Sequence, residues 1–434
     1  MAKPEKARQV VMLLENNPYP QDTRVRNEAE SLSEAGVGVT VLAPRGPGQS
    51  SRQWINGVEV RRYRMLWAHS SAPSYLAEYA VAHLQLLTRA ALALARGARV
   101  LHFHGPPDTL FAGAILARAA GRSVVFDLHD SGPELFRAKF GSSAPVSWAL
   151  RGAQRQAINW ASHVIVTNES QRQLVRERGR RGEDEVSVVR NGPRGSEFAN
   201  PRPPRSGSLA EPRLIYVGAL DTQDGVLELA DLLASPMLAS ATLTIVGDGP
   251  IRPQLLARCE QLGVAERVTF TGLLPHAEVP GLIAEADIGL DPAPGSELNH
   301  GSSMIKVLEY MGARRPLVAY ELRETRASAG AAALYAPCGD PEAFAACVAR
   351  LARESELRLR LAELAHSRAA ELAWDRQAQI LQAVYRRLLR VEPAAERSQI
   401  EPLASEQPAA VEPALEPLAL ELRKYSPAGA VSGS

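Results

Sequence analysis

The residues best suited to chemistry lie between positions 291 and 326, where an apolar run, a Gly-rich polar loop and a helical pattern follow one another. A helix beginning near Ser302 would offer unpaired N–H groups and a positive dipole end to an anion, beside the hydroxyls of Ser302 and Ser303. At about 100° per residue, Lys306 and Glu309 share a face with Ser302. The spacing predicts a diphosphate site, with Lys306 as cation and Glu309 accepting hydrogen bonds from a ribose. The alternative is a surface helix with a solvated pair of charges.

A second strand-like run, TIVGDGP, ends in glycines at positions 244–250. Gly247 and Gly249 would let the backbone approach a ligand closely. The pattern is weaker than the G-x-G-x-x-G fingerprint of dinucleotide sites, which also needs a following acidic residue. A plain turn from strand to helix is the alternative.

Charged residues crowd the start of a helix predicted at positions 22–35. Asp22 or the residue after it can cap this helix, and Arg24 and Arg26 fall in its first turn. Cations are disfavoured there by the helix dipole, which hints that one of them faces an anion in a cleft. Ion pairs with Glu28 or Glu30 would explain them equally well.

The segment FDLHDSGPELF places His129 and Asp130 directly after a buried strand, where a ligand of the first sheet would be met. A histidine in that place can hydrogen-bond a sugar or titrate near neutrality. A structural cap made by Asp130 is the alternative.

Short Val-rich runs alternate with helical patterns along most of the chain, which is typical of parallel sheets with helices on both faces. The segment 200–212 is rich in Pro, Gly and Ser and reads as a linker between two similar α/β halves. Two such halves would face each other across a cleft at the carboxyl ends of their strands. Segment 391–434 is rich in Pro, Glu and Ala, which predicts a disordered tail. The predicted strands are 10–14, 39–43, 58–63, 100–104, 124–128, 164–167, 186–189, 214–217, 243–246, 268–271, 288–290, 317–320 and 333–336.

Net charge, cysteine content and the lengths of the apolar segments argue against several kinds of partner and cellular location. The formal net charge of +1 gives no global attraction to nucleic acid. The three cysteines lack metal-ligand spacing and suit a reducing compartment. The apolar run after the N-terminus is too short for a signal peptide, and the stretch 80–95 falls short of the ~20 residues of a membrane span. We expect a cytoplasmic protein, with contact at an inner membrane surface left open. The five arginines between 172 and 181 could meet anionic lipid, although a solvated face is the alternative.

Taken together, the segments resemble the retaining glycosyltransferases of the GT-B fold, in the large family 4 of polysaccharide and glycolipid enzymes. The motifs that carry the resemblance are PYPQDTRVRNEAESL, FDLHDSGPELF, VTNESQR, VVRNGP, YVGALDTQDGV and GSSMIKVLEYMGARRPLVAYELRETR. The resemblance implies an α/β protein of two doubly wound, Rossmann-like domains facing across a cleft. It assigns residues 1–199 to an acceptor domain, 213–372 to a nucleotide-sugar domain, and 373–390 to a last helix that crosses back.

The resemblance and the segments together predict one site for each substrate. His129, Lys306 and Glu309 are the predicted catalytic residues. Predicted acceptor contacts are Asp22, Arg24, Arg26, His129, Asp130 and Glu134. Predicted donor contacts are Gly218, Gly247, Gly249, Asn299, Ser302, Ser303, Met304, Lys306 and Glu309.

The chain departs from the family pattern in two places. The first of the family's two donor-site glutamates is replaced by Gly301, and the cations expected after the first strand of the second domain are replaced by residues that include Asp224. The diphosphate charge would then fall to Lys306, to helix N-termini or to Arg24. Asn299, Ser302 and Ser303 would take over sugar and phosphate contacts.

The resemblance implies transfer from a nucleotide-diphosphate sugar with retention of anomeric configuration, without a pair of catalytic carboxylates. The leaving diphosphate would take the acceptor proton while protein groups stabilise its charge. We expect no cofactor, no essential metal and no nucleic acid; the acceptor would be a glycan, a lipid-linked molecule or a small molecule. The alternatives are a non-catalytic sugar- or nucleotide-binding homologue and a nucleotide-sugar epimerase of similar fold.

Overall fold

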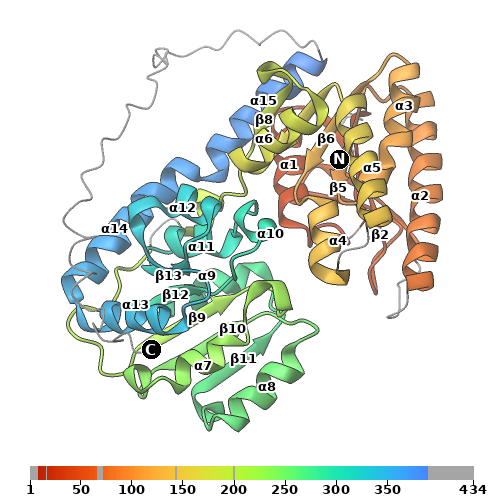
Figure 1. Ribbon diagram of the computed structural model, residues 1–434. Coiled ribbons are helices and arrows are strands. Elements are labelled where there is room, and N and C mark those ends of the chain that lie inside the picture. Colours follow the sequence, from red (N-terminus) through yellow and green to blue (C-terminus); the bar gives the residue numbers. More distant parts are fainter. Residues whose placement is uncertain (1–7, 16, 66–71, 142–143, 199–200, 390–434) are drawn as a thin grey trace, which may run out of the picture. The chain divides into compact units, whose positions relative to one another are not determined.

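The computed structural model describes residues 8–15, 17–65, 72–141, 144–198 and 201–389 (Figure 1). The tail predicted at 391–434 lies outside these residues. The predicted α/β architecture of two parallel sheets is confirmed. Each predicted strand is present, with ends that differ from the prediction by at most two residues. Among the described residues, no helix combines the length and the apolar character that crossing a bilayer demands.

The first sheet has eight strands in the order β3-β4-β2-β1-β5-β6-β7-β8. Neighbouring strands are parallel except β3 and β4. The order extends from β1 in both directions, which is a doubly wound arrangement. The strands are β1 (Arg8–Leu13), β2 (Gly38–Pro44), β3 (Arg52–Ile55), β4 (Val58–Tyr63), β5 (Val100–Gly105), β6 (Ser123–Leu128), β7 (His163–Val166) and β8 (Val186–Val188).

Strand β3 is absent from the strands predicted by sequence. Its four residues, RQWI, are mostly exposed at the sheet edge and carry none of the apolar pattern of a buried strand. Asn56 and Gly57 join β3 to β4, and both have positive φ, 47° and 83°. Asn-Gly with this backbone is the favoured two-residue turn of an antiparallel hairpin. That dipeptide is the feature of the sequence from which the β3–β4 hairpin could have been predicted.

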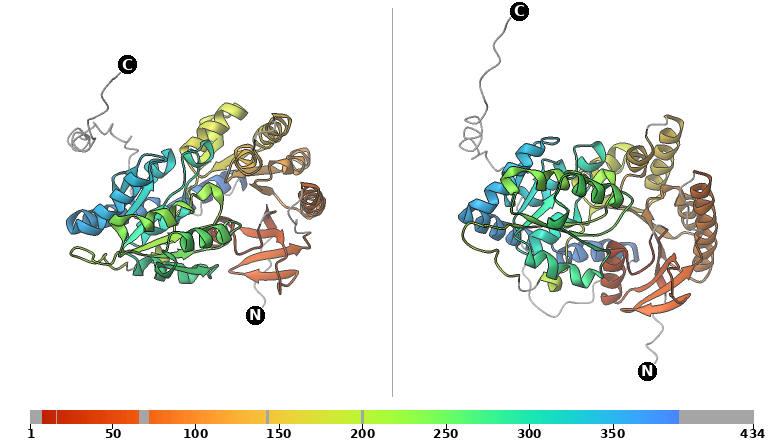
Figure 2. Two further views of the ribbon diagram at one scale, coloured as in Figure 1. Left: turned by 60° about the horizontal axis from the view of Figure 1, so that its bottom comes forward. Right: turned by 90° about the horizontal axis from the view of Figure 1, so that it is seen from below.

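Helices cover both faces of the first sheet because its central strands are apolar on both sides. Val11 and Leu13 of β1 pack with α2, α3 and α5, whereas Val10 and Met12 pack with α1 and α15. The right-hand view of Figure 2 shows the first strands between the dark red α1 and the brown-orange α2. The helices are α1 (Thr23–Glu34), α2 (Ala72–Ala95), α3 (Phe111–Ala119), α4 (Gly132–Phe140), α5 (Ala144–Trp160) and α6 (Glu169–Gly179).

The second sheet has six parallel strands in the order β11-β10-β9-β12-β13-β14. Helices α7, α8 and α13 pack on one face, and α9, α11 and α14 pack on the other (Figure 1). The strands are β9 (Arg213–Val217), β10 (Thr242–Val246), β11 (Val268–Gly272), β12 (Ile288–Asp291), β13 (Leu317–Tyr320) and β14 (Ala333–Ala336). The helices are α7 (Glu228–Ala234), α8 (Arg252–Gln261), α9 (Val279–Glu285), α10 (Glu297–His300), α11 (Ile305–Gly312), α12 (Arg323–Ala329), α13 (Pro341–Arg353) and α14 (Ser355–Leu372).

The last described helix, α15 (Trp374–Leu389), packs on the first sheet rather than the second. Its Trp374 Nε1 donates to Ser31 Oγ on α1 at 2.8 Å. The chain thus passes between the two halves twice, and the two passages touch. The backbone N–H of Trp374 donates to Pro193 O at 2.9 Å, and a Cβ on Gly192 would lie 1.9 Å from Leu372 O. The domain boundaries themselves remain predictions.

Candidate functional site

Lys306 lies on α11 beside the carboxyl end of β12, and its side chain is only 7% exposed. Its Nζ is 3.4 Å from Asp224 Oδ1 and 3.5 Å from Asp291 Oδ1, and it lies over the ring of Tyr216. Burial alone would lower the pKa of Lys306, but the carboxylates of Asp291 and Asp224 outweigh that effect and raise it. Lys306 is therefore a charged ammonium whose charge is already offset within the chain.

Glu309 follows one turn later on α11 and is 8% exposed. His276 lies close to it, with its Nε2 3.8 Å from Glu309 Oε1. Burial raises the pKa of the Glu309 carboxyl. The burial of both Lys306 and Glu309 excludes the alternative of a solvated surface pair.

The prediction that the helix begins near Ser302 is wrong, because α11 begins at Ile305. A separate short helix, α10, precedes it, and Ser296 Oγ caps that helix by accepting from the Asn299 N–H. The chain must therefore turn between the two helices. Ser302 lies in this turn, where its Oγ donates to Leu298 O at 2.8 Å. The predicted single face with Ser302 on the same helix as Lys306 and Glu309 does not exist.

The remaining residues predicted on the loop are mostly engaged with the protein itself. Asn299 is 3% exposed, and its Nδ2 donates to Gln223 O and Pro294 O. Ser303 Oγ accepts from Asn168 Nδ2 at 3.0 Å, and the same amide donates to Gly301 O at 2.9 Å. Met304 is the N-cap residue of α11 and packs against the core.

Asn168 joins this loop to the first sheet, a role that the sequence does not reveal. Its Oδ1 caps α6 by accepting from the Gln171 N–H. Its Nδ2 reaches residues 133 and 135 positions later in the chain. A contact over that separation leaves no local pattern.

The three predicted donor-site glycines lie where β9 and β10 exit the second sheet. A Cβ on Gly247 would lie 1.9 Å from Gly218 O, and a Cβ on Gly249 would lie 2.3 Å from Leu220 O. Gly218 and Gly247 also have φ of +151° and +138°. The close approach that requires glycine is therefore between two segments of the chain itself, which agrees with the plain-turn alternative. Their contact with a donor remains a prediction.

The sequence predicts that Arg24 or Arg26 faces an anion in a cleft, and Arg24 is not that residue, because its partners lie within the chain. Its Nε and Nη2 donate to the two oxygens of Asp127 at 2.8 and 2.7 Å, and its Nη1 donates to Val189 O. The predicted ion pair with Glu28 is present at 3.2 Å. Arg24 is buried and fully engaged, which leaves it no free donor for a diphosphate. Asp22 caps α1 as predicted, by accepting from the Val25 N–H.

His129 and Asp130 follow β6, as the sequence indicates. The Nε2 of His129 is 3.0 Å from Asp127 Oδ2, and the His129 side chain is 14% exposed. Burial raises the pKa of Asp130. These two residues and Asp22 face one another closely enough that charge on Asp22 and His129 contributes to the pKa of Asp130.

A cavity of about 300 Å³ is lined by one predicted acceptor contact, Glu134, and by one predicted donor contact, Ser302, but not by His129 or Asp130. Glu134 from α4 lines it on one side and Ser302 on the other. Glu134 pairs with Arg178 at 2.6 Å and accepts from Ser131. Burial opposes ionisation of Glu134, but Arg178 and Ser131 hold its pKa below the usual range. Further residues around the cavity are Ser131, Gln171, Arg178, Glu297 and Arg323.

Arg26 lines a different cavity, of about 440 Å³, which none of the other predicted acceptor contacts lines. Glu197 and His276 line the same cavity, and Arg26 Nη2 is 3.8 Å from Glu197 Oε1. His276 links this second cavity to Glu309.

The arginines between 172 and 181 are largely paired within the first domain. Arg178 pairs with Glu134, Arg176 with Glu183, and Arg172 with Glu169. Arg181 donates to the carbonyls of Ile158, Asn159 and Ala161. These contacts favour a structural role over a lipid-binding one.

Comparison with known families divides the chain at the same place as the two sheets. The family described as "Glycosyl transferase 4-like domain" matches residues 21–192, and the family "Glycosyl transferases group 1" matches residues 211–354. Together they include every predicted site residue.

Proteins similar to this chain in sequence or structure include named glycosyltransferases. An alpha-D-kanosaminyltransferase of Streptomyces kanamyceticus is 28% identical over 290 residues, which is 62% of this chain and 71% of that protein. A 2-deoxystreptamine N-acetyl-D-glucosaminyltransferase of Streptomyces fradiae is 35% identical over 106 residues, 24% of each chain. The solved structure of Anabaena HepE in complex with UDP-glucose superposes with a TM-score of 0.64 at 17% identity, over 87% of this chain and 99% of that one.

Proposed function

The chain belongs to the group 1 glycosyltransferases of GT-B fold, enzymes that use nucleotide-sugar donors, and we propose that it transfers its sugar with retention of anomeric configuration. The observation that carries the proposal is the buried pair Lys306 and Glu309 on α11, beside the carboxyl end of β12. Ligands of parallel α/β sheets bind at this edge.

In the donor site, Lys306 stabilises the diphosphate and Glu309 accepts hydrogen bonds from the ribose hydroxyls. Burial strengthens both interactions because little water competes for them. The proposal assigns Ser302 and Ser303, in the turn before α11, to phosphate or sugar contacts. UDP-glucose is the first donor to test, because the structurally similar Anabaena HepE was solved with it.

In the transfer step, the bond between the sugar and the diphosphate breaks while the acceptor oxygen approaches the same face of the sugar. The leaving diphosphate takes the acceptor proton, and Lys306 stabilises the negative charge that develops. No carboxylate of the protein has to act as nucleophile in this step, and the proposed reaction needs no metal. Transfer should therefore be unchanged by a chelator.

For the acceptor, the proposal places a hydroxyl-bearing molecule near His129, Asp130 and Glu134, beside the cavity of about 300 Å³. Its class is a glycan, a lipid-linked sugar or a small polyol. The Streptomyces relatives include an enzyme named for 2-deoxystreptamine, so an aminocyclitol is a suitable small-molecule acceptor to test. A role in polysaccharide, glycolipid or glycoconjugate biosynthesis is the broader form of the proposal.

The decisive variant is Glu309→Ala, tested with a panel of UDP-, GDP- and TDP-sugars for slow donor hydrolysis. Losing a charged acceptor of ribose hydrogen bonds should raise the donor KM at least about 10-fold, which corresponds to ~1.4 kcal/mol. The control is Glu285→Ala, an exposed glutamate at the end of α9. Unchanged donor affinity in Glu309→Ala, measured by calorimetry, would contradict the site. No nucleotide release from any donor would contradict the activity.

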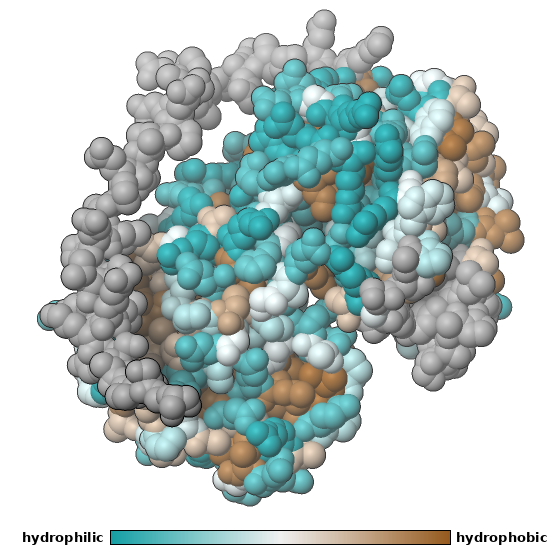
Figure 3. All heavy atoms as spheres, viewed as in Figure 1, coloured by the Kyte–Doolittle hydropathy of each residue, from teal (hydrophilic) through white to brown (hydrophobic). Residues whose placement is uncertain are grey.

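We further propose peripheral contact with an anionic membrane through α2, α3 and α5. Helix α3 packs against both of the others, and neither α3 nor α5 contains Asp or Glu. Figure 3 shows apolar side chains gathered over α2 and α3. Exposed apolar residues beside exposed arginines suit anionic headgroups. The residues are Leu84, Leu92, Ile115, Leu116, Val146 and Trp148, with Arg96, Arg118, Arg151 and Arg155.

Sedimentation with lipid vesicles tests this contact. The protein should pellet with phosphatidylglycerol vesicles at low salt, and much less with phosphatidylcholine vesicles, because the arginines need anionic headgroups. The double variant Arg151→Ala/Arg155→Ala should weaken the binding. Equal pelleting of wild type and variant with both vesicle types would rule out an electrostatic contact.

A further inference from the structure

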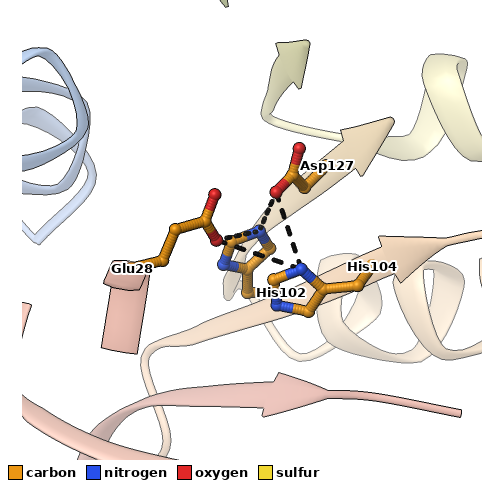
Figure 4. A group of neighbouring side chains, drawn as sticks. All are labelled: Glu28, His102, His104 and Asp127. Carbon is orange, nitrogen blue, oxygen red and sulfur yellow. Dashed lines mark ion pairs between the residues drawn. The ribbon is translucent and has the colours of Figure 1, made fainter. Parts of the chain in front are cut away.

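Four side chains with metal-ligating atoms meet in the interior of the first domain, close to His129. They are Glu28 of α1, His102 and His104 of β5, and Asp127 of β6, each 2% exposed or less. Figure 4 shows both carboxylates pointing toward the two imidazole rings. The distances between their facing atoms are 3.5–3.9 Å.

A metal ion at the centre of this cluster does not fit its hydrogen bonds. Both oxygens of Asp127 already accept from Arg24, and Oδ2 also faces His129 Nε2 at 3.0 Å. Oδ2 is the oxygen that faces the imidazoles, and with two donors it has no lone pair left to bind a cation. The guanidinium of Arg24 is also 3.2 Å from Glu28, so a divalent ion would lie beside a fixed positive charge. A role for the cluster must therefore be consistent with Asp127 as a carboxylate that accepts from Arg24 and His129.

The bond between Asp127 and His129 fixes where His129 carries its proton. Burial alone would raise the pKa of Asp127, but the guanidinium of Arg24 holds it well below the usual range, so Asp127 is a carboxylate that can only accept. At 3.0 Å from Asp127 Oδ2, the Nε2 of His129 must be the donor. A neutral imidazole has one N–H, so the Nδ1 of His129 carries a lone pair.

The free nitrogen is the one that a substrate can reach. Within the described part of the chain, no hydrogen bond engages Nδ1 of His129, and the side chain is 14% exposed. The backbone of His129 is also held, because Gln171 Nε2 donates to its carbonyl oxygen. Ring position and tautomer are thus both determined by buried neighbours.

Resting on the proposed function, we infer that Asp127 is a positioning residue that holds His129 as the Nε2–H tautomer, so that Nδ1 accepts a hydrogen bond from a substrate hydroxyl. Arg24 supports this arrangement by keeping both Asp127 oxygens in place. A hydroxyl that donates to Nδ1 is held in one orientation and positions the substrate for transfer, while the attacking hydroxyl keeps its proton for the leaving diphosphate. Asp127 acts only through His129 and does not touch the substrate.

The first test measures the tautomer directly in the wild-type protein, by nitrogen-15 NMR of labelled histidine, with His129→Gln to assign the signal. The expected spectrum has a protonated Nε2 and an unprotonated Nδ1 on His129. A protonated Nδ1 in the neutral ring would overturn the inference. This measurement needs no substrate, so it stands even if every donor and acceptor fails and the proposed function falls.

The second test is a double-mutant cycle with Asp127→Asn and His129→Gln. In Asp127→Asn, the new side-chain amide can donate to Nε2 and reverse the tautomer, so kcat should fall about 100-fold or more while the donor KM changes little. In the His129→Gln background, the same substitution should change kcat less than about 3-fold. An equal loss in both backgrounds would show that Asp127 acts on the fold alone. Asp231→Asn, on the surface of α7, is the control, and melting temperatures identify any variant that fails to fold.

Discussion

At the residue scale, Lys306 is notable for the two carboxylates that surround it. Asp291 ends β12 and is fully buried, whereas the Asp224 side chain is 15% exposed and 3.4 Å from Lys306 Nζ. Burial raises the pKa of Asp224, although Lys306 opposes that shift. A diphosphate that binds Lys306 must compete with Asp224, because both are anions that need the same ammonium.

Asp224→Asn should therefore strengthen donor binding. Removal of one competing charge at a largely buried site is worth ~1 kcal/mol, which predicts a fall of about 5-fold in the donor KM. Titration calorimetry with the donor measures this change, and Asp231→Asn is the matched control at the surface. A rise in KM would mean that Asp224 contacts the donor favourably instead.

Local sequence reveals the types of most candidate site residues but not their partners. Lys306, Glu309, His129 and Asp130 are identifiable because each follows a buried strand or lies at a helical spacing from another polar residue. Asp127 does not stand out, because it reads as the polar end of a Val-rich strand. Its bond with Arg24 spans 103 positions, and no local pattern encodes a pairing of that kind.

At the element scale, the strands are predictable and one helix start is not. Runs of valine, leucine and isoleucine mark strands buried on both faces, such as β5 and β13. The loop before α11 reads as part of that helix because serines commonly cap helices. The serine that does cap is Ser296, at the start of α10. Two short helices in succession cannot be told from one by spacing alone.

Helix α15 provides an element whose packing can be measured. Trp374 is 2% exposed, packs with α1 and donates to Ser31. Trp374→Ala should lower the free energy of unfolding by about 3–5 kcal/mol, as expected for a large buried side chain that leaves a cavity. Trp148→Ala, at a side chain that is 79% exposed, should change it by less than ~0.5 kcal/mol. Urea unfolding followed by circular dichroism compares the two, and equal losses would contradict this packing.

At the scale of the whole molecule, residues 201–212 are not a free linker between the two sheets. Arg205 pairs with Asp287, and its carbonyl accepts from the buried Arg358 at 2.7 Å. Leu209 N–H donates to Ala352 O. This segment is fastened along the second half, so a change of angle between the halves must occur before it. Among the described residues before this segment, Gly192 and Pro193 contact residues 372–374.

Gly192→Ala should disturb that contact, because the new Cβ would lie 1.9 Å from Leu372 O. We expect a loss of stability of about 1–3 kcal/mol, with a fall in kcat if the two halves must move during turnover. Gly152→Ala is the matched control, since it lies in α5 with open space around it and should be slightly stabilising. Thermal unfolding and steady-state rates distinguish the two, and identical behaviour would mean that the chain relaxes freely at Gly192.

The touching passages have a mechanical consequence. Two separate connections would let the two halves move relative to each other in several directions. Here the two connections are joined by the hydrogen bond from Trp374 to Pro193, so they act as a single hinge. A rotation that separates the two halves would have to break the bonds from Asn168 to Gly301 and Ser303, from the Ser170 N–H to Glu324 and from Arg137 to Glu297. The hydrogen bonds of the Asn168 amide therefore restrain rotation of the two halves about Gly192–Pro193.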